Sequence, residues 1–356
     1  MKKTIDVLDK TDSIRCESDS TECYAITRLL TAGTLHFADH DGNPNPEAYL
    51  EIRSLELDTN PGKGHPSAPV RFVRNSEQKT ITLLSDGQVL NTLAVSELAT
   101  PAAVKALFPH LTLRSMNTRA GRPDALRVEA TDRFGAMHTM RFRLLSALGP
   151  GSTLLAASEA THFCFKAVGL TDEDAQRLNA ITAFPDWLNG ILSEAQVVFE
   201  GIQSTVFRDN LSFIDTQMDQ MLVWVLFNYY CGKGHWVNDL VDLLEKANPW
   251  ELPESKLYRF KFKQWLGYLA RGMTAEHPWE GKEDATDGLI VVKEDGSVLG
   301  FLPYDRTHLE SYLLQHTRFD TPSRSHHHYG RLFKKADGSW YFHLPLHVRF
   351  TGMRNA

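Results

Sequence analysis

The spacing of apolar residues changes twice along this 356-residue chain, and these changes limit the folds that it can adopt. Between Val70 and residue 166, short segments alternate apolar with polar residues, which is typical of β-strands. Residues 171–271 instead place apolar residues at helical spacing, and the alternation returns from Gly288 to Phe350. The sequence therefore predicts an α/β (α+β) fold, in which a mixed sheet has flanking helices and a helical insertion.

Turn signals refine this prediction. Asp-Gly pairs at 86–87, 295–296 and 337–338 each separate two apolar segments, and such pairs favour β-hairpins. A further strand pair is predicted around a turn at residues 132–135. The predicted strands cover residues 80–84, 88–90, 124–130, 138–145, 161–166, 288–293, 298–302, 329–334 and 340–350.

The composition fits a globular protein with a full core, since 42% of the residues are hydrophobic and 23% are charged. We predict an N-terminal lobe with strands and loops over residues 1–100 and a main domain over 101–356. Within the main domain, the helical region is residues 171–271 and a C-terminal part is residues 285–350. The formal net charge of −6 excludes a generally basic surface, so any contact with nucleic acid must come from a local patch.

The first residues do not predict a secretory signal, because Asp6 and Asp9 stand where such a signal needs apolar residues. The longest apolar run, residues 221–227, is shorter than the roughly 20 residues that cross a bilayer. The cysteines form no C-x-x-C pair, which favours free thiols in a reducing compartment. We therefore expect a cytoplasmic protein with no membrane partner.

Two polar rows lie on predicted elements that are otherwise largely apolar. The last predicted strand has one apolar face, and its other face carries an unusual polar row that suggests a ligand. This row consists of Tyr341, His343, His347 and Arg349. The predicted helix 254–271 carries a basic stripe suited to phosphates, unless the stripe is an ordinary solvated face. The stripe consists of Lys256, Arg259 and Lys263.

One segment carries part of a metal-dependent hydrolysis motif. Such hydrolysis of DNA needs carboxylates that hold a hard cation, and often a lysine that orients water. The PD-(D/E)XK nucleases place an aspartate at the start of one strand and a (D/E)-x-K on the next. Here Pro123 and Asp124 open a predicted strand, but the matching positions of the next strand hold Arg143 and Leu145. A turn or strand-start role is the alternative for Asp124.

A series of short motifs follows in a fixed order. Residues 142–146 read FRLLS, residues 153–158 read TLLAAS, and residues 317–323 read TRFDTPS. Further motifs lie at residues 161–163, 258–263, 288–293, 329–330 and 344–350. In this order the motifs resemble the HpaII-type family of type II restriction endonucleases.

This resemblance implies a restriction-endonuclease-like mixed sheet and site-specific cleavage of double-stranded DNA, with Mg²⁺ as the cofactor. It also implies a functional pairing with a cognate DNA methyltransferase, in the restriction of foreign DNA such as that of phages. Whether a homodimer is needed to cut both strands stays open.

The family's lysine falls on Leu145, which can neither bind a metal nor move a proton. A displaced lysine, Lys166, is one explanation, with Asp124 and Glu129 as the metal ligands and Asp132 as the alternative to Glu129. Another is a fold that has kept its DNA surface and lost hydrolysis, and that reads sequence or base modification. A third is metal-independent excision of DNA bases.

Sequence readout in the major groove favours arginine against guanine, with hydroxyl groups on phosphates. Three adjacent side chains cannot all point at one ion, so the histidines at 326–328 predict a DNA contact or an exposed loop rather than a metal site. The family has asparagine and glutamine at the positions of Pro345 and His347, which implies a different target sequence. Besides the basic stripe, the expected DNA-contact residues are Arg318, Ser323, Arg324, His326, His328, His343, His347 and Arg349.

Overall fold

The computed structural model describes residues 18–39, 41–57, 70–99, 125–149, 151–281, 287–302, 306–323 and 329–352. The chain forms two compact units, the first from segments at 1–35, 49–117 and 126–139 and the second from the remainder. The predicted boundary of the N-terminal lobe, between residues 100 and 101, falls outside the described residues and stays a prediction. Each unit is described by itself below.

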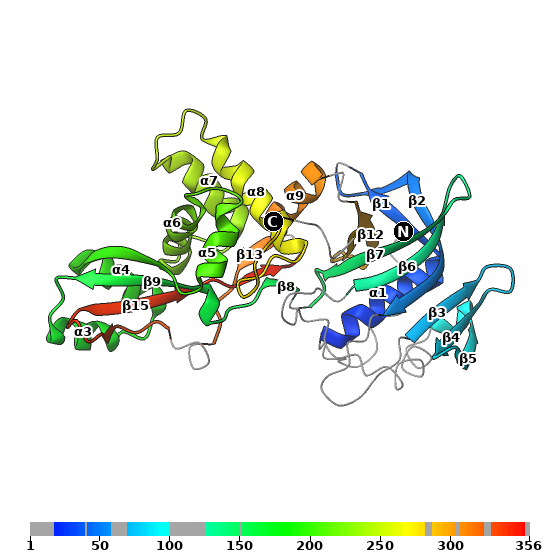
Figure 1. Cartoon of the computed structure of the whole chain (residues 1–356), viewed down its shortest axis with the longest axis horizontal. Helices are drawn as coiled ribbons and strands as arrows, with labels where there is room; N and C mark the ends of the chain where they lie inside the picture. Colours follow the sequence, from blue (N-terminus) through cyan, green and yellow to red (C-terminus); the bar gives the residue numbers. More distant parts are fainter. Residues whose placement is uncertain are drawn as a thin grey trace. The chain divides into compact units, whose positions relative to one another are not determined.

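A nine-stranded mixed sheet confirms the predicted fold class (Figure 1). Its order is β1-β12-β11-β7-β6-β2-β3-β4-β5. The strands are β1 (Thr34–Ala38), β2 (Pro44–Leu57), β3 (Val70–Asn75), β4 (Thr80–Ser85), β5 (Gln88–Ala94), β6 (Ala125–Asp132), β7 (Met137–Ser146), β11 (Gly288–Val292) and β12 (Val298–Phe301). Strands β7 and β11 run parallel, with Phe142 opposite Gly288 and Ser146 opposite Val292. Because a parallel pair needs a long crossover connection, this pairing explains the helical insertion between the two strands.

The first unit is built from helix α1 (Ser18–Ala32), the short helix η1 (Val95–Ala99) and the antiparallel strands around β2. Its core includes Leu29 of α1, Phe72 of β3 and Val128 of β6, each at most 1% exposed. The hairpin predicted from the Asp-Gly pair at 86–87 is confirmed between β4 and β5. Both turn residues have positive φ, 50° for Asp86 and 74° for Gly87, as a tight hairpin turn requires.

The second unit holds the helical insertion. Thr171 caps the first helix of this region, because its side chain accepts a hydrogen bond from the backbone N–H of Asp174. The helices are α3 (Asp172–Asn179), α4 (Phe184–Glu194), α5 (Thr205–Ser212), α6 (Met218–Tyr230), α7 (Val237–Ala247), α8 (Lys256–Ala270) and, beyond β12, α9 (Arg306–Gln315). Helix α8 buries Trp265, Leu266 and Leu269 completely, as its spacing predicts. None of the helices in the described ranges has the length and apolar character of a bilayer-spanning segment.

Two smaller sheets complete the second unit. The first has four strands, in the order β10 (Gln196–Ile202), β9 (His162–Val168), β15 (Trp340–Pro345) and β14 (Phe333–Lys334). The second has three strands, in the order β13 (Thr317–Phe319), β16 (Val348–Phe350) and β8 (Ser152–Leu155).

The last predicted strand is in fact two strands in two different sheets, so its prediction as one element is wrong. Strand β15 ends at Pro345, which has no N–H for a further ladder bond. The next residue, Leu346, donates its N–H to Thr161 O, and the chain enters the three-stranded sheet at Val348. The apolar face persists through the break, since Phe342, Leu346 and Phe350 are all at most 1% exposed.

Arg143 ties the central strand β7 to the end of helix α8. Its guanidinium is buried and donates to the carbonyl oxygens of Leu269 at 2.7 Å and Ala270 at 2.9 Å. Burial lowers the pKa of Arg143 to about 10, so the side chain stays charged at neutral pH. A cation at this place complements the negative end of the helix dipole and adds a donor to two carbonyl groups of the last turn, of which that of Leu269 also accepts the backbone N–H of Gly272.

We predict that Arg143→Ala lowers the free energy of unfolding by about 2–4 kcal/mol, because it leaves a cavity and removes one donor from each of two carbonyl groups, those of Leu269 and Ala270. Denaturation in urea at pH 7 measures this loss. The control is Arg208→Ala, whose wild-type side chain is 55% exposed and should change stability by less than about 0.5 kcal/mol. Equal losses in the two variants would contradict the structural role of Arg143.

Candidate nucleic-acid interface

The predicted metal ligands begin with Glu129 on β6. Its carboxylate accepts a hydrogen bond from Ser54 Oγ at 2.8 Å and forms an ion pair with Arg71. Ser54 lies directly opposite Glu129 on β2, so the three side chains share one face of the sheet. Asp124 lies outside the described residues, and the structure therefore does not show whether it joins Glu129.

Asp132, the alternative ligand, closes the hairpin between β6 and β7. Its Oδ1 accepts the backbone N–H groups of Phe134 and Ala136, each at 2.9 Å. Its Oδ2 lies 2.9 Å from Nε2 of His138, and this hydrogen bond lowers the pKa of Asp132 below its usual value. These contacts give Asp132 a structural role in the turn.

Lys166, the predicted displaced lysine, lies on β9 in the four-stranded sheet. Its Nζ is 3.3 Å from Oδ2 of Asp337, which also accepts a hydrogen bond from the hydroxyl group of Tyr341. The contact with Asp337 raises the pKa of Lys166. The Asp337 pKa is about 2, chiefly because Asp337 accepts the backbone N–H of Ser339. In this arrangement Lys166 is a cation that could neutralise a phosphate, not a neutral base.

The position of the family's lysine is closed to solvent. Leu145 is 1% exposed, belongs to the hydrophobic core and lies opposite Val291 on β11. Its neighbour Arg143 points to the carbonyl groups of α8 and is equally withdrawn from the surface. Within the residues that the structure describes, no three histidine, cysteine or acidic side chains gather closely enough to hold a metal ion.

The basic stripe on α8 is mostly engaged by neighbouring helices. Arg259 forms ion pairs with Glu245 and Asp242 of α7. Lys263 donates from Nζ to Ser311 Oγ of α9 at 2.9 Å, whereas Lys256 at the start of the helix is exposed. Arg259 therefore joins α7 to α8, and Lys256 is the stripe residue most open to a phosphate.

A cationic pair lies on the three-stranded sheet. Arg318 on β13 stands directly opposite Arg349 on β16, so the two side chains extend from the same face. Arg349 donates from Nε to Oδ2 of Asp320 at 2.9 Å. In the described part of the chain, the Nε of Arg318 is buried and has no hydrogen-bond partner. Because like charges that face each other across strands are unfavourable, this pair points to an anionic or acceptor-rich ligand.

His347 joins this pair through Arg349. Its Nδ1 lies 3.1 Å from the backbone nitrogen of Ala157, and its carbonyl oxygen accepts the backbone N–H of Asp320. Its Nε2 is 3.4 Å from Nη2 of Arg349. The structure thus brings together Arg318, His347 and Arg349. The motif TRFDTPS contains Asp320, but sequence analysis did not predict its contact with Arg349.

The other predicted contact residues lie elsewhere or beyond the described residues. His343 belongs to the four-stranded sheet, where its ring packs against Phe333 and His162, and burial lowers its pKa. Ser323 is exposed at the end of the described segment after β13. Arg324, His326 and His328 fall outside the described residues.

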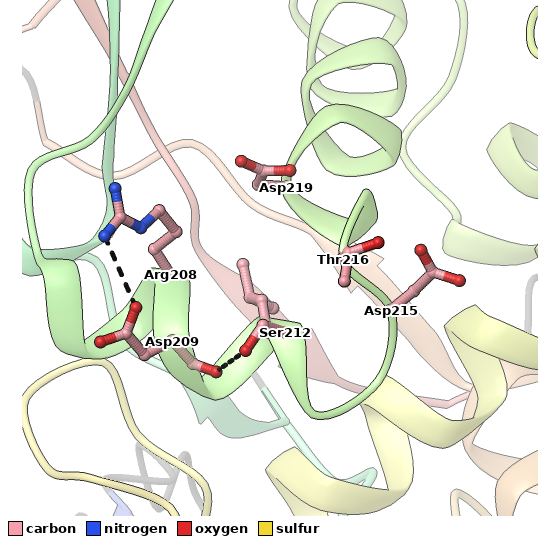
Figure 2. Close-up of a pocket in the computed structure, with 7 residues that line it drawn as sticks. Arg208, Asp209, Ser212, Asp215, Thr216 and Asp219 are labelled. Atoms are coloured by element: carbon pink, nitrogen blue, oxygen red, sulfur yellow. Dashed lines mark hydrogen bonds and ion pairs between the residues drawn. The ribbon is translucent and has the colours of Figure 1, made fainter.

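An acidic hollow of about 200 Å³ lies between α5 and the start of α6 (Figure 2). Figure 2 shows carboxylates of Asp209, Asp215 and Asp219 around it, with Arg208 turned toward Asp209 at 3.6 Å. Asp215 is also 3.5 Å from Nζ of Lys261. The negative charge makes this hollow a poor surface for phosphates.

We predict that Leu145→Lys does not restore a catalytic lysine. An ammonium group at this buried position lacks a partner, so the variant should lose at least about 3 kcal/mol of unfolding free energy. Leu145→Met keeps the volume and should lose less than about 1.5 kcal/mol. Urea denaturation compares the two. A Leu145→Lys protein as stable as the wild type would show that this part of the core is open to water.

Comparisons with known proteins agree with the motif order. The model of the HpaII restriction endonuclease family matches residues 17–350. The type II restriction enzyme HpaII of Haemophilus parainfluenzae is 29% identical over 350 residues, which cover 93% of this chain and 96% of that protein. No solved structure matches the chain. Since the family model covers nearly the whole sequence, the chain belongs to the HpaII restriction endonuclease family.

Proposed function

We propose that this restriction endonuclease recognises a specific sequence in double-stranded DNA through the face that carries Arg318 and Arg349, and hydrolyses phosphodiester bonds with Mg²⁺. The proposed recognition of a DNA sequence is supported by Arg318 and Arg349, which lie directly opposite each other on neighbouring strands. They concentrate positive charge at one place on a chain whose formal net charge is −6. A local patch of this kind supplies the phosphate attraction and base contacts that the overall charge does not.

The contact surface extends from this pair to neighbouring groups. His347 stands beside Arg349, and the segment from Ser323 toward Arg324, His326 and His328 follows directly after the strand of Arg318. We include His343 and the α8 stripe as outer contacts. In that stripe, Lys256 is the exposed member, while Arg259 and Lys263 already have protein partners.

For hydrolysis we retain Asp124 and Glu129 as the metal ligands and Lys166 as the cation near the scissile phosphate. Glu129 offers the carboxylate oxygen that Mg²⁺ prefers, but it is engaged by Arg71 and Ser54, so the described residues alone do not form a metal site. Bound Mg²⁺ would supply charge stabilisation and a more acidic water. The role of Lys166 is to hold positive charge, which its raised pKa maintains at neutral pH.

A binding protein without hydrolysis is the second candidate. The observation that favours it is the burial of Leu145 and Arg143 at the positions where the family motif is polar. Such a protein would retain DNA, selectively for sequence or base modification, and leave it uncut. Metal-independent base excision is a further alternative, and it would persist in a chelator.

The wider role that we propose is cytoplasmic restriction of phage and other foreign DNA, paired with a cognate DNA methyltransferase that protects the host sequence. A homodimer is one arrangement that would let two sites cut the two strands.

We predict that purified protein cuts plasmid DNA in Mg²⁺ and that a chelator abolishes cutting. Asp124→Ala and Glu129→Gln should remove activity, and Lys166→Met, which removes a stabilising positive charge, should lower the rate by about 10²–10³-fold. The measurement is the rate of conversion from supercoiled to linear plasmid. Matched controls are Glu51→Gln, a half-exposed carboxylate on β2, and Lys334→Met, an exposed lysine on β14.

Three results would contradict parts of this assignment. Cutting that survives Asp124→Ala removes that residue from the metal site. Abasic sites formed in the presence of chelator indicate base excision instead. Retention of DNA without cutting in any divalent metal supports the binding protein.

We predict that Arg318→Ala and Arg349→Ala each weaken binding of DNA by about tenfold or more, because each removes a cation from the same sheet face. Filter retention or fluorescence anisotropy in chelator measures binding apart from cutting. The salt dependence of the binding constant should also become less steep. The control is Arg331→Ala, an exposed arginine away from the three-stranded sheet. Unchanged affinity in both variants would exclude this face as the DNA surface.

A further inference from the structure

The turn that joins β6 to β7 (Figure 1) carries the two most exposed large apolar side chains of the described residues. Phe134 is 80% exposed and Met137 is 71% exposed. We call these two side chains the apolar tip. Single exposed apolar residues are ordinary on a protein surface, but two of them at one turn form a protruding apolar group. Because apolar area stabilises a fold only when it is buried, the apolar tip adds little to the stability of the hairpin.

The backbone beneath the apolar tip is held by Asp132. Its Oδ1 accepts the backbone N–H groups of Phe134 and Ala136, each at 2.9 Å. Its carbonyl oxygen accepts the N–H of Gly135 at 3.0 Å, and its own N–H donates to the carbonyl oxygen of Ala136 at 2.9 Å. A side chain on a turn that is fixed in this way loses little backbone freedom on binding, so the apolar tip is already arranged to enter a ligand.

The small size of the apolar tip distinguishes DNA from a protein partner. A stable protein interface buries about 1,200–2,000 Å² in total, and two side chains supply only a small part of that area. The hairpin does not extend the tip into a larger patch on β6, because Leu126 and Val128 are at most 1% exposed. A wedge in a base-pair step, in contrast, needs only one or two apolar side chains, and phenylalanine and methionine are among those that proteins insert between bases.

Positive charge accompanies the ring of Phe134. The guanidinium carbon of Arg133 lies 4.7 Å from the ring centroid, and the ring stays largely exposed in spite of this contact. The stacked cation leaves the opposite face of the ring for a base. Since phosphates flank each base step on both strands, a cation beside the ring favours DNA as the partner.

We propose that the apolar tip is a wedge that enters a base-pair step of duplex DNA, with Phe134 against a base and Met137 beside it. This inference rests on the proposed function, because it requires binding of duplex DNA near Glu129. The chain from Glu129 to Phe134 spans at most roughly 18 Å, about half of one helical turn of B-DNA. The step that the wedge enters therefore lies within about half a turn of the phosphate at Glu129. Partial insertion unstacks this step and kinks the duplex, which changes its winding.

Unwinding of a closed circular plasmid tests the wedge. Duplexes that the wild type enriches from a randomised pool in chelator are cloned as tandem copies into the plasmid. The full chain is then incubated in chelator with this plasmid and a metal-independent type I topoisomerase, and the topoisomers are separated after the protein is removed. We expect the wild type to shift the linking number in proportion to bound protein. Phe134→Ala should reduce the shift per bound protein by about threefold or more, because it removes the ring that separates the bases.

Further variants separate the wedge from general effects of surface substitution. Phe134→Leu keeps an apolar wedge and should retain more of the shift than Phe134→Ala, and Met137→Ala should reduce the shift to a smaller extent. The matched control is Phe213→Ala, since Phe213 is 60% exposed but lies at the end of α5, next to the acidic hollow. This control should shift the linking number as the wild type does. Thermal unfolding should be the same in all four variants, because each substitution removes an exposed side chain.

Two results would overturn the inference alone. One is a wild-type protein that binds the tandem copies and leaves the linking number unchanged. The other is an equal shift per bound protein in the wild type and Phe134→Ala. Sedimentation of the free protein identifies the alternative occupant, a second copy of the chain. A dimer that dissociates in Phe134→Ala, with unwinding unchanged, assigns the apolar tip to that contact instead.

Failure of the proposed function has a different signature. A wild-type protein that retains no duplex DNA overturns the proposed function and the inference with it. A protein that binds duplexes but enriches no motif overturns the site-specific function only. The same unwinding measurement on a plasmid without tandem copies then decides whether Phe134 enters the base stack.

Discussion

The parallel pairing of β7 with β11 is the constraint on which the second unit depends. Residues 142–146 and 288–292 lie side by side in this pair, although more than 140 positions separate them in the sequence. A parallel partner cannot be reached by a tight turn, so the intervening chain must leave the sheet and return. That chain forms the helices α3 to α8 and contributes β8, β9 and β10 to the two smaller sheets.

The same pairing places Leu145, the position where the resemblance puts the family's lysine, inside the core. A strand with neighbours on both sides and a packed face favours apolar residues, and Leu145 contributes to that core. Arg143 points to the end of α8, where its charge is useful to folding rather than to chemistry. Arg143 and Leu145, two positions apart on β7, therefore both serve structural contacts.

Much of the fold could be predicted from the sequence because its signals are local. The Asp-Gly pairs, the cap at Thr171 and the spacing in α8 depend on residues within a few positions of one another. The division of the last strand between two sheets depends instead on Thr161, which lies far away in the sequence and accepts the N–H of Leu346. Leu257 shows the same limit, since its spacing places it inward but it is 43% exposed in the first turn of α8.

The sequence could predict which residue types form the candidate site, but not which of these residues contact one another. Sequence motifs select Arg318, His347 and Arg349, but only the register between β13 and β16 shows that the two arginines face each other. Likewise, nothing in the sequence indicates that Arg71 neutralises Glu129 or that α7 occupies Arg259. Ion pairs between distant segments decide which charges remain available to a ligand, and periodicity carries no information about them.

Under the proposed function, the opposed arginines would serve binding rather than folding. Cations that face each other across two strands destabilise a free protein, and here Asp320 compensates one of them. A buried acceptor or aliphatic residue in place of Arg318 would remove the repulsion, yet the chain keeps a buried Nε without a partner among the described residues. Binding of an acceptor-rich ligand would recover this cost. The surface is therefore expected to be more stable in complex with DNA than alone, in contrast to Arg143, whose charge is satisfied within the fold.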